Sequence, residues 1–266
     1  AAAMIAKKDP DATMVVMPSD HVINDAKKFR EAIEAGERLV DEDLSRIVTF
    51  GIPPTYPAES FGYVEGGNEI ECDDATVRQV KQFREKPDRH TAEMYVDSGN
   101  YYWNSGIFLW RASTILNALE SFEPEMYAHR SAIADAIGTP KFGSVLQTEF
   151  EAIKGTSIDY AVLERYDNVV VVDAPFPWDD LGSWQALSRL HQPDDHGNTV
   201  IGSHLGIDTQ GSIIHSEGDH TIVTIDIKDL IVVHTGDATL VAPKHAEERV
   251  REVVKELEAK KMQEKL

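Results

Sequence analysis

The sequence predicts an α/β protein that continues into a small all-β unit and a terminal helix. Over residues 1–190, apolar strand-like runs alternate with helical patterns, which favours a mixed, mainly parallel sheet with helices on both faces. In residues 191–243, short β-branched runs are broken by Gly, Asp and Asn every several residues, which is typical of a meander or a short solenoid. Residues 244–266 carry an apolar stripe among charges, which predicts a helix.

Local patterns place the individual segments of the α/β part. Asn24 is a good helix cap, and the helix predicted over 25–41 turns Phe29, Ile33 and Val40 toward one face. Residues 77–87 alternate in period two and stop at Pro87, as a strand does. The other predicted segments are the tail of a helix at the start, strands at 12–17, 45–52, 101–110 and 168–176, and helices from Thr91 and at 112–122, 125–137 and 157–166.

Composition limits the partners. The chain of 266 residues has 26 Lys and Arg against 46 Asp and Glu, a net charge of −20, which disfavours binding to nucleic acid or to an anionic membrane. No apolar run approaches the roughly 20 residues of a membrane span. The single Cys72 excludes an internal disulfide and a cysteine metal cluster, so we expect a reducing, cytoplasmic location. An anionic small ligand would need a local cation.

Two acidic turns follow apolar strands. Asp20 comes just after "VVMPS", and Asp179 and Asp180 follow another strand in "PFPWDDLGSW". Ligands of open α/β sheets bind outside the carboxyl ends of the strands, and Mg²⁺ prefers carboxylate oxygens, so both turns are candidate metal-binding segments. The alternative is structural: Asp20 would belong to a turn, and Asp180 would cap the helix that begins near Ser183.

Three polar interruptions lie within apolar surroundings, at 62–65, 85–87 and 104–106. Among them, Lys86 supplies the local cation that a phosphate ligand needs. Asp159 completes the capping-box spacing Thr156-x-x-Asp159, which favours helix capping over ligand contact, although we keep it as a substrate-binding candidate. His21 is interpreted equally well as a residue that orients the turn or as one that touches substrate.

Taken in order, the motifs "MPSDH", "FGYVE", "FREKPD", "YYWNSGIFLW", "SIDYAVLE" and "PFPWDDLGSW" resemble the mannose-1-phosphate guanylyltransferases of the sugar-nucleotidyltransferase superfamily. The resemblance runs from about Met14 to Leu187, and the β-rich tail is similar to that of the short members of the family. It implies a nucleotide-diphosphosugar transferase fold, which is Rossmann-like, over residues 1–190.

The resemblance also implies a reaction and a set of site residues. In the reaction, α-D-mannose 1-phosphate and GTP give GDP-mannose and pyrophosphate with Mg²⁺. By matching positions, Asp20 and Asp180 would bind Mg²⁺, and Lys86 would lie near the sugar phosphate. The sugar pocket would contain the Gly62 backbone, Glu65, Glu85 and Asn104. Catalysis would rest on Asp20, Lys86 and Asp180, and no general base is required.

The sequence departs from the family in one respect. Members begin with a strand and a glycine-rich, basic loop that holds the triphosphate, whereas the glycine pair at 66–67 follows the "FGYVE" motif and has no adjacent basic residue. We therefore expect the N-terminal part of the transferase domain to be missing from these residues, and the chain as given to be inactive without its triphosphate-binding loop. The alternatives are a non-catalytic binding or regulatory protein, or a transferase for another sugar or nucleotide. A homodimer is left open.

Overall fold

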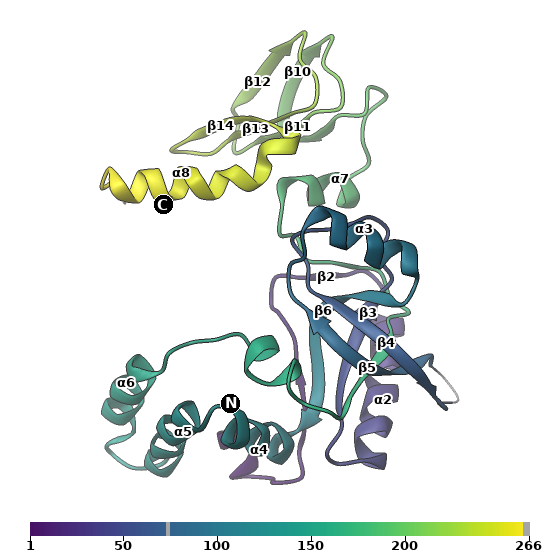
Figure 1. The fold of residues 1–266 in the computed structure, drawn as a ribbon. Helices are drawn as coiled ribbons and strands as arrows, with labels where there is room; N and C mark the ends of the chain where they lie inside the picture. Colours follow the sequence, from purple (N-terminus) through teal and green to yellow (C-terminus); the bar gives the residue numbers. More distant parts are fainter. Residues whose placement is uncertain (73–74, 263–266) are drawn as a thin grey trace. The chain divides into compact units, whose positions relative to one another are not determined.

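The computed structural model describes residues 1–72 and 75–262, in two compact units that comprise Ala1–Trp178 and Asp179–Leu266 (Figure 1). Unit 1 is built on a six-stranded sheet of order β1-β6-β3-β7-β5-β4. Its strands are β1 (Thr13–Val16), β3 (Ile47–Ile52), β4 (Tyr63–Ile70), β5 (Val77–Arg84), β6 (Tyr101–Arg111) and β7 (Val169–Asp173). The short β2 (Val22–Ile23) follows β1, and β8 (Trp178–Asp179) crosses the boundary between the units.

The sheet is mixed, as predicted, but antiparallel pairing predominates where mainly parallel pairing was expected. Only β3 and β7 run parallel in the described part of this sheet. The long strand β6 runs antiparallel to β1, β3 and β4, and the consecutive strands β4 and β5 also pair antiparallel. The reason is that a hydrophobic pattern locates a strand but does not give its direction, and strands that follow one another in the sequence, such as β4 and β5, can pair antiparallel through a short connection.

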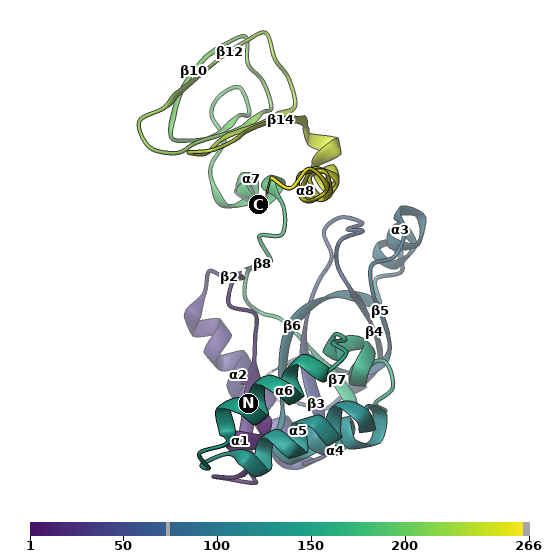
Figure 2. The same cartoon turned by 90° about the vertical axis from the view of Figure 1, so that its left-hand side faces the viewer.

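Helices cover both faces of this sheet, which confirms that prediction. In Figure 2, α4 (Ala112–Phe122) lies in front of the sheet and α2 (Ala26–Glu42) behind it. Successive strand residues point to opposite faces, so Val48 and Phe50 pack toward α2, whereas Val169 and Val171 pack toward α4 and the π-helical turn η1 (Asp159–Leu163). We call these the α2 face and the η1 face. Each buried aliphatic or aromatic side chain stabilises the fold by roughly 1.5–3 kcal/mol.

Capping differs from the prediction by one residue at α2. The carboxylate of Asp25, and not Asn24, accepts the Lys28 backbone N–H at 3.0 Å, and the helix runs from Ala26 to Glu42. Likewise α3 begins at Arg89 and not at Thr91, because Asp88 caps it by accepting the Thr91 N–H. Asn and Asp are nearly equal as caps, so neighbouring candidates are not separated by propensity.

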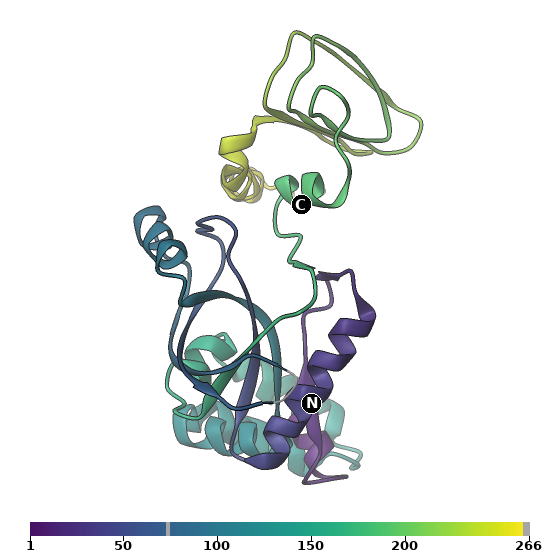
Figure 3. The ribbon, with the colours of Figure 1, turned by 90° about the vertical axis from the view of Figure 1, so that its right-hand side faces the viewer.

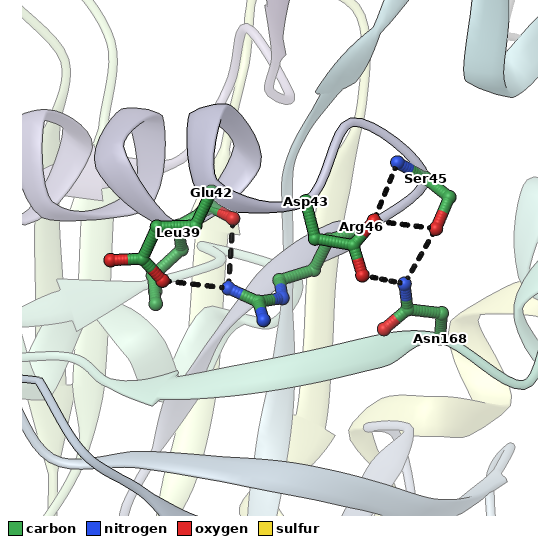
Figure 4. Close-up of polar contacts among 6 residues, drawn as sticks. All are labelled: Leu39, Glu42, Asp43, Ser45, Arg46 and Asn168. Atoms are coloured by element: carbon green, nitrogen blue, oxygen red, sulfur yellow. Dashed lines mark hydrogen bonds and ion pairs between the residues drawn. The ribbon is translucent and has the colours of Figure 1, made fainter.

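A polar network joins the end of α2 to the start of β3 (Figure 4). Asp43 accepts hydrogen bonds from the Ser45 backbone and hydroxyl and from Asn168 Nδ2. These bonds lower the pKa of Asp43 below its usual value, and the bond from the Ser45 side chain has the largest effect. The Ile47 N–H donates to the Asn168 carbonyl at 3.0 Å. The network therefore fixes the register in which β3 and β7 begin.

The remaining helices of unit 1 are α1 (Ala2–Ala6), α3 (Arg89–Ser98), α5 (Pro124–Ala136) and α6 (Phe142–Ala152). The helices α4, α5 and α6 lie side by side in both views (Figures 1 and 2). No sequence pattern singled out α6, which has no buried residue. In the described part of the chain, no helix has the length and apolarity needed to cross a membrane.

Unit 2 is a short solenoid, the second of the two predicted forms. Strands β9, β11 and β13 pair parallel, as do β10 and β12, and paired residues such as Ser203 and Thr221 lie 18 positions apart (Figure 3). Its elements are η2 (Trp184–Ala186), α7 (Leu187–Leu190), β9 (Thr199–Ile201), β10 (Ser203–Ile207), β11 (Ile213–Ser216), β12 (Thr221–Ile225), β13 (Leu230–His234), β14 (Thr239–Pro243), η3 (Lys244–Arg249) and α8 (Val250–Ala259). The last four residues of the predicted terminal helix lie outside the described residues.

Candidate functional site

Four of the predicted site residues gather on the η1 face of unit 1. The Asn104 backbone N–H donates to the Gly62 carbonyl at 2.8 Å, and Asn104 Nδ2 donates to Asp159 Oδ1 at 2.9 Å. A Cβ added to Gly62 would lie 2.5 Å from Glu85 Oε2 and 3.6 Å from Asn104 Cβ. We call Gly62, Glu85, Asn104 and Asp159 the polar cluster. Only a glycine at position 62 leaves the Glu85 carboxylate its present place.

An irregularity in β6 presents Asn104 to the cluster. The pairing of β3 with β6 shifts register between Thr49 and Gly51, opposite the predicted interruption at 104–106. Gly106 adopts φ +70°, and its N–H donates to Asn104 Oδ1 at 3.2 Å. The buried Thr49 hydroxyl lies 3.5 Å from the same oxygen and donates to the Ile107 carbonyl at 3.2 Å. Sequence reasoning missed Thr49, whose only signal is a hydroxyl within an apolar strand.

Asp159 does not cap a helix, so that interpretation is wrong. Ile158 occupies the cap position of η1, and Asp159 is the first residue of the turn itself. The segment winds as a π-helical turn, which directs the Asp159 carboxylate to the Asn104 amide. Such turns occur frequently at functional sites.

Glu85 and Lys86 bring opposite charges to the cluster. Lys86 Nζ lies 3.3 Å from Glu85 Oε1, and the side chains are 60% and 18% exposed, respectively. Burial raises the pKa of Glu85, the nearby Asp159 raises it further, and Lys86 opposes the shift. Lys86 also adopts φ +46°, a left-handed conformation that costs free energy for a residue with a side chain. Perturbed pKa values cluster at functional sites, so the raised pKa of Glu85 favours a binding role for this part of the protein.

The raised pKa of Glu85 predicts a pH-dependent gain in stability for Glu85→Gln. The folded state binds this proton more tightly than the unfolded state, so the stabilisation is complete below the usual value of 4.5 and is lost as pH rises through the raised pKa. We therefore expect Glu85→Gln to melt at a higher temperature than wild type at about pH 7, with the difference vanishing below about pH 4.5. The substitution also removes the ion pair between Glu85 and Lys86, but because Lys86 is exposed this loss should change the free energy of unfolding little.

Thermal unfolding measured across this pH range checks that result. Asp97→Asn is the matched control, since Asp97 is an exposed carboxylate on α3. Equal behaviour of the two variants at all pH values would show that Glu85 carries no burial penalty.

The structure does not bring Glu65 into the polar cluster. Glu65 pairs with Tyr101, one step along β4 from the Val64–Tyr102 pair, so its side chain points to the α2 face. Its carboxylate accepts from Gln82 Nε2 at 2.8 Å and from the Tyr101 hydroxyl at 3.2 Å. Glu65 is three positions from Gly62 in the motif, and this odd spacing separates the two across the sheet.

The loop that carries Asp20 lies against the bend in β6. Asp20 is exposed and follows β1. A Cβ at Gly106 would lie 3.4 Å from Pro18 Cγ and 3.9 Å from His21 Cε1, so the residues on both sides of Asp20 contact the turn that presents Asn104. Asp20 therefore belongs to the same part of unit 1 as the polar cluster.

The two acids at the start of unit 2 have different surroundings. Arg189 Nη2 donates to Asp179 Oδ1 at 3.0 Å, and Arg189 Nε contacts the other oxygen. Asp180 Oδ1 accepts the Gly182 N–H at 3.1 Å, and a Cβ at Gly182 would lie 2.5 Å from Asp180 Oδ2. Asp180 thus forms a turn but caps no helix, because Ser183 occupies the cap position of η2. An Arg neutralises Asp179, which makes Asp180 the better candidate for a metal ligand.

Carboxylates such as Asp20 and Asp180 have the hard oxygen donors that suit Mg²⁺, which usually takes one or two protein carboxylates and completes its shell with water and phosphate oxygens. Within residues 1–72 and 75–262, no group of three or more His, Cys, Asp or Glu residues could hold a metal ion.

With this geometry established, comparison with known proteins defines the class. A family described as "Nucleotidyl transferase" matches residues 1–196, and one described as "MannoseP isomerase/GMP-like beta-helix domain" matches residues 202–257. The chain therefore belongs to the nucleotidyl transferase family.

Individual relatives have more specific names than the family. The chain is 37% identical over 253 residues to "Mannose-1-phosphate guanylyltransferase ManC" of Salmonella typhimurium, covering 94% of this chain and 52% of the relative. It is 32% identical over 260 residues to "Alginate biosynthesis protein AlgA" of Pseudomonas aeruginosa, covering 97% and 53%. A crystal structure described as that of a "mannose-1-phosphate geranyltransferase" from Thermus thermophilus matches with a TM-score of 0.84 and 31% identity, covering 97% and 73%. The chain spans about half the length of the two curated relatives.

Proposed function

We propose that the protein transfers a nucleotidyl group from GTP to α-D-mannose 1-phosphate, giving GDP-mannose and pyrophosphate, and that the polar cluster is its sugar-phosphate subsite. The observation that carries this proposal is the convergence of Gly62, Glu85, Asn104 and Asp159 on one face, with Lys86 beside them. Carboxylate and amide groups recognise sugar hydroxyls, and an ammonium suits a phosphate.

Each residue has a role that its geometry supports. Gly62 leaves space beside the sugar ring, and Glu85 accepts hydrogen bonds from hydroxyls. An amide has two N–H groups and two lone pairs, so the bond to Asp159 does not exhaust Asn104. Lys86 is 60% exposed and therefore able to reach a phosphate from the edge of the cluster. Asp159 holds the Asn104 amide in place and contacts the sugar only through it.

Asp20 and Asp180 are the proposed Mg²⁺ ligands, and the ion, when bound, would neutralise negative charge on the triphosphate. The sugar phosphate is already an anionic nucleophile, so the chain needs to supply no general base. Its own contribution is alignment: the cluster fixes the sugar, Lys86 holds the phosphate, and the attacking oxygen is thereby directed at the α-phosphate of GTP. Positioning of this kind supplies a large share of the rate in phosphoryl transfer.

Two measurements test the proposal together. Calorimetry should show that the protein binds mannose 1-phosphate more tightly than glucose 1-phosphate, which differs only at the 2-hydroxyl. When these residues are joined to an N-terminal strand and glycine-rich triphosphate loop, GDP-mannose should form from GTP and mannose 1-phosphate with Mg²⁺, and the corresponding products should form more slowly from ATP or UTP. Binding without turnover would support the non-catalytic alternative, and turnover only with another nucleotide or sugar would change the substrate assignment.

A further inference from the structure

Trp178, at the end of unit 1, contacts two segments that flank the candidate site. Its indole N–H donates to His21 Nδ1 at 3.1 Å, and the two rings meet edge to face with centroids 5.2 Å apart. On another side it meets Phe61 edge to face, with centroids 5.6 Å apart. His21 follows Asp20 directly, and Phe61 precedes Gly62 directly.

The hydrogen bond from Trp178 determines which ring nitrogen of His21 acts as the acceptor. An indole N–H is only a donor, so the Nδ1 that it faces must be the acceptor, which leaves the ring N–H on Nε2. The same ring presents Cε1 to the Gly106 bend. The bond therefore holds the orientation of a side chain adjacent to Asp20. It also adds a long-range restraint to an exposed loop.

The contact with Phe61 acts on a different segment. Phe61 is 8% exposed and also packs edge to face on Trp103, the residue before Asn104. Aromatic pairs of this geometry contribute beyond the area that they bury. The ring of Trp178 thus supports the backbone on which Gly62 and Asn104 lie.

We propose that Trp178 is a positioning residue of the nucleotidyl transfer site. Its N–H orients His21 and the Asp20 loop, and its ring supports the Gly62 side of the polar cluster. The inference rests on the proposed function, because the loop and the cluster are assigned to metal and sugar there. It predicts that substitutions at Trp178 can separate the effect of the N–H from the effect of the ring.

Trp178→Phe keeps an aromatic ring against Phe61 and removes the N–H together with the five-membered ring that carries it. We expect its kcat to fall about threefold to tenfold, the effect of one lost hydrogen bond, with the Kd for mannose 1-phosphate within about twofold of wild type. Trp178→Leu removes the ring as well and should also weaken mannose 1-phosphate binding. Trp110→Phe is the matched control, because Trp110 is buried in the same unit and its Nε1 has no hydrogen-bond partner in the described structure.

A spectroscopic readout separates this inference from the proposed function. Nitrogen-15 NMR of the His21 side chain should show the Nε2–H tautomer in wild type and in Trp110→Phe, and a mixture of tautomers in Trp178→Phe. Unchanged kcat together with an unchanged tautomer in Trp178→Phe would overturn the inference.

Should Trp178→Phe fail to fold, His21→Leu removes the same bond from the exposed loop and should lower kcat equally. Failure of the wild type to bind mannose 1-phosphate would instead reject the proposed function.

Discussion

Asp180→Asn is expected to reduce GDP-mannose formation by about 100-fold or more, because a bound metal ion contributes several kcal/mol of charge stabilisation and the amide keeps the shape of the carboxylate but loses its charge. The fold should be unaffected, since an amide oxygen can still accept the Gly182 N–H. Steady-state kinetics across a range of Mg²⁺ concentrations measures this effect, and thermal unfolding checks the fold.

Asp179→Asn is the matched control for this substitution. Arg189 already neutralises Asp179, so this carboxylate is committed to an ion pair within unit 2. We expect a loss of about tenfold or less, caused by a misplaced turn and not by a lost metal ligand. Equal losses at the two neighbouring positions would contradict the choice of Asp180.

The second large effect is expected at Asn104. Asn104→Ala removes a sugar contact and leaves Asp159 without its amide partner, so mannose 1-phosphate should bind more weakly by roughly 1–3 kcal/mol, about 5-fold to 150-fold in Kd. The affinity for GTP should change little. Isothermal calorimetry with each ligand separately measures both values.

Glu65→Ala is the corresponding control. Glu65 lies on the α2 face with its carboxylate bound to Gln82 and Tyr101, so we expect the Kd for mannose 1-phosphate to stay within about twofold of wild type. A strong effect at Glu65 with none at Asn104 would move the sugar subsite to the α2 face.

The sequence predicted the elements of unit 1 wherever apolar patterning is strong. The buried runs of β3 and β7 and the amphipathic α2 were found because burial on one or both faces leaves a clear pattern. The helix α6 was missed because it buries no residue completely, and Phe150 is even 68% exposed. Strand direction was misjudged because the pattern of β6 is the same whichever way the strand runs.

The motifs supplied a set of candidate site residues, but the sequence could not supply their arrangement. Asn104 and Asp159 are 55 positions apart, and their hydrogen bond depends on a bulge and a π-helical turn that no local pattern announces. Glu65 shows the same limit: the resemblance assigned it to the sugar pocket, whereas the alternation of side chains along β4 directs it to the face opposite the polar cluster. Motifs propose candidate residues, whereas the pleat and register of the strands determine which of these residues meet.

A crystal structure of the protein with mannose 1-phosphate would test the central claim most directly. We predict the sugar on the η1 face, with a hydroxyl bound to the Glu85 carboxylate, the ring beside Gly62, a contact to the Asn104 amide, and the phosphate next to Lys86. Sugar density on the α2 face beside Glu65 and Tyr101, or at a place remote from the polar cluster, would contradict this assignment.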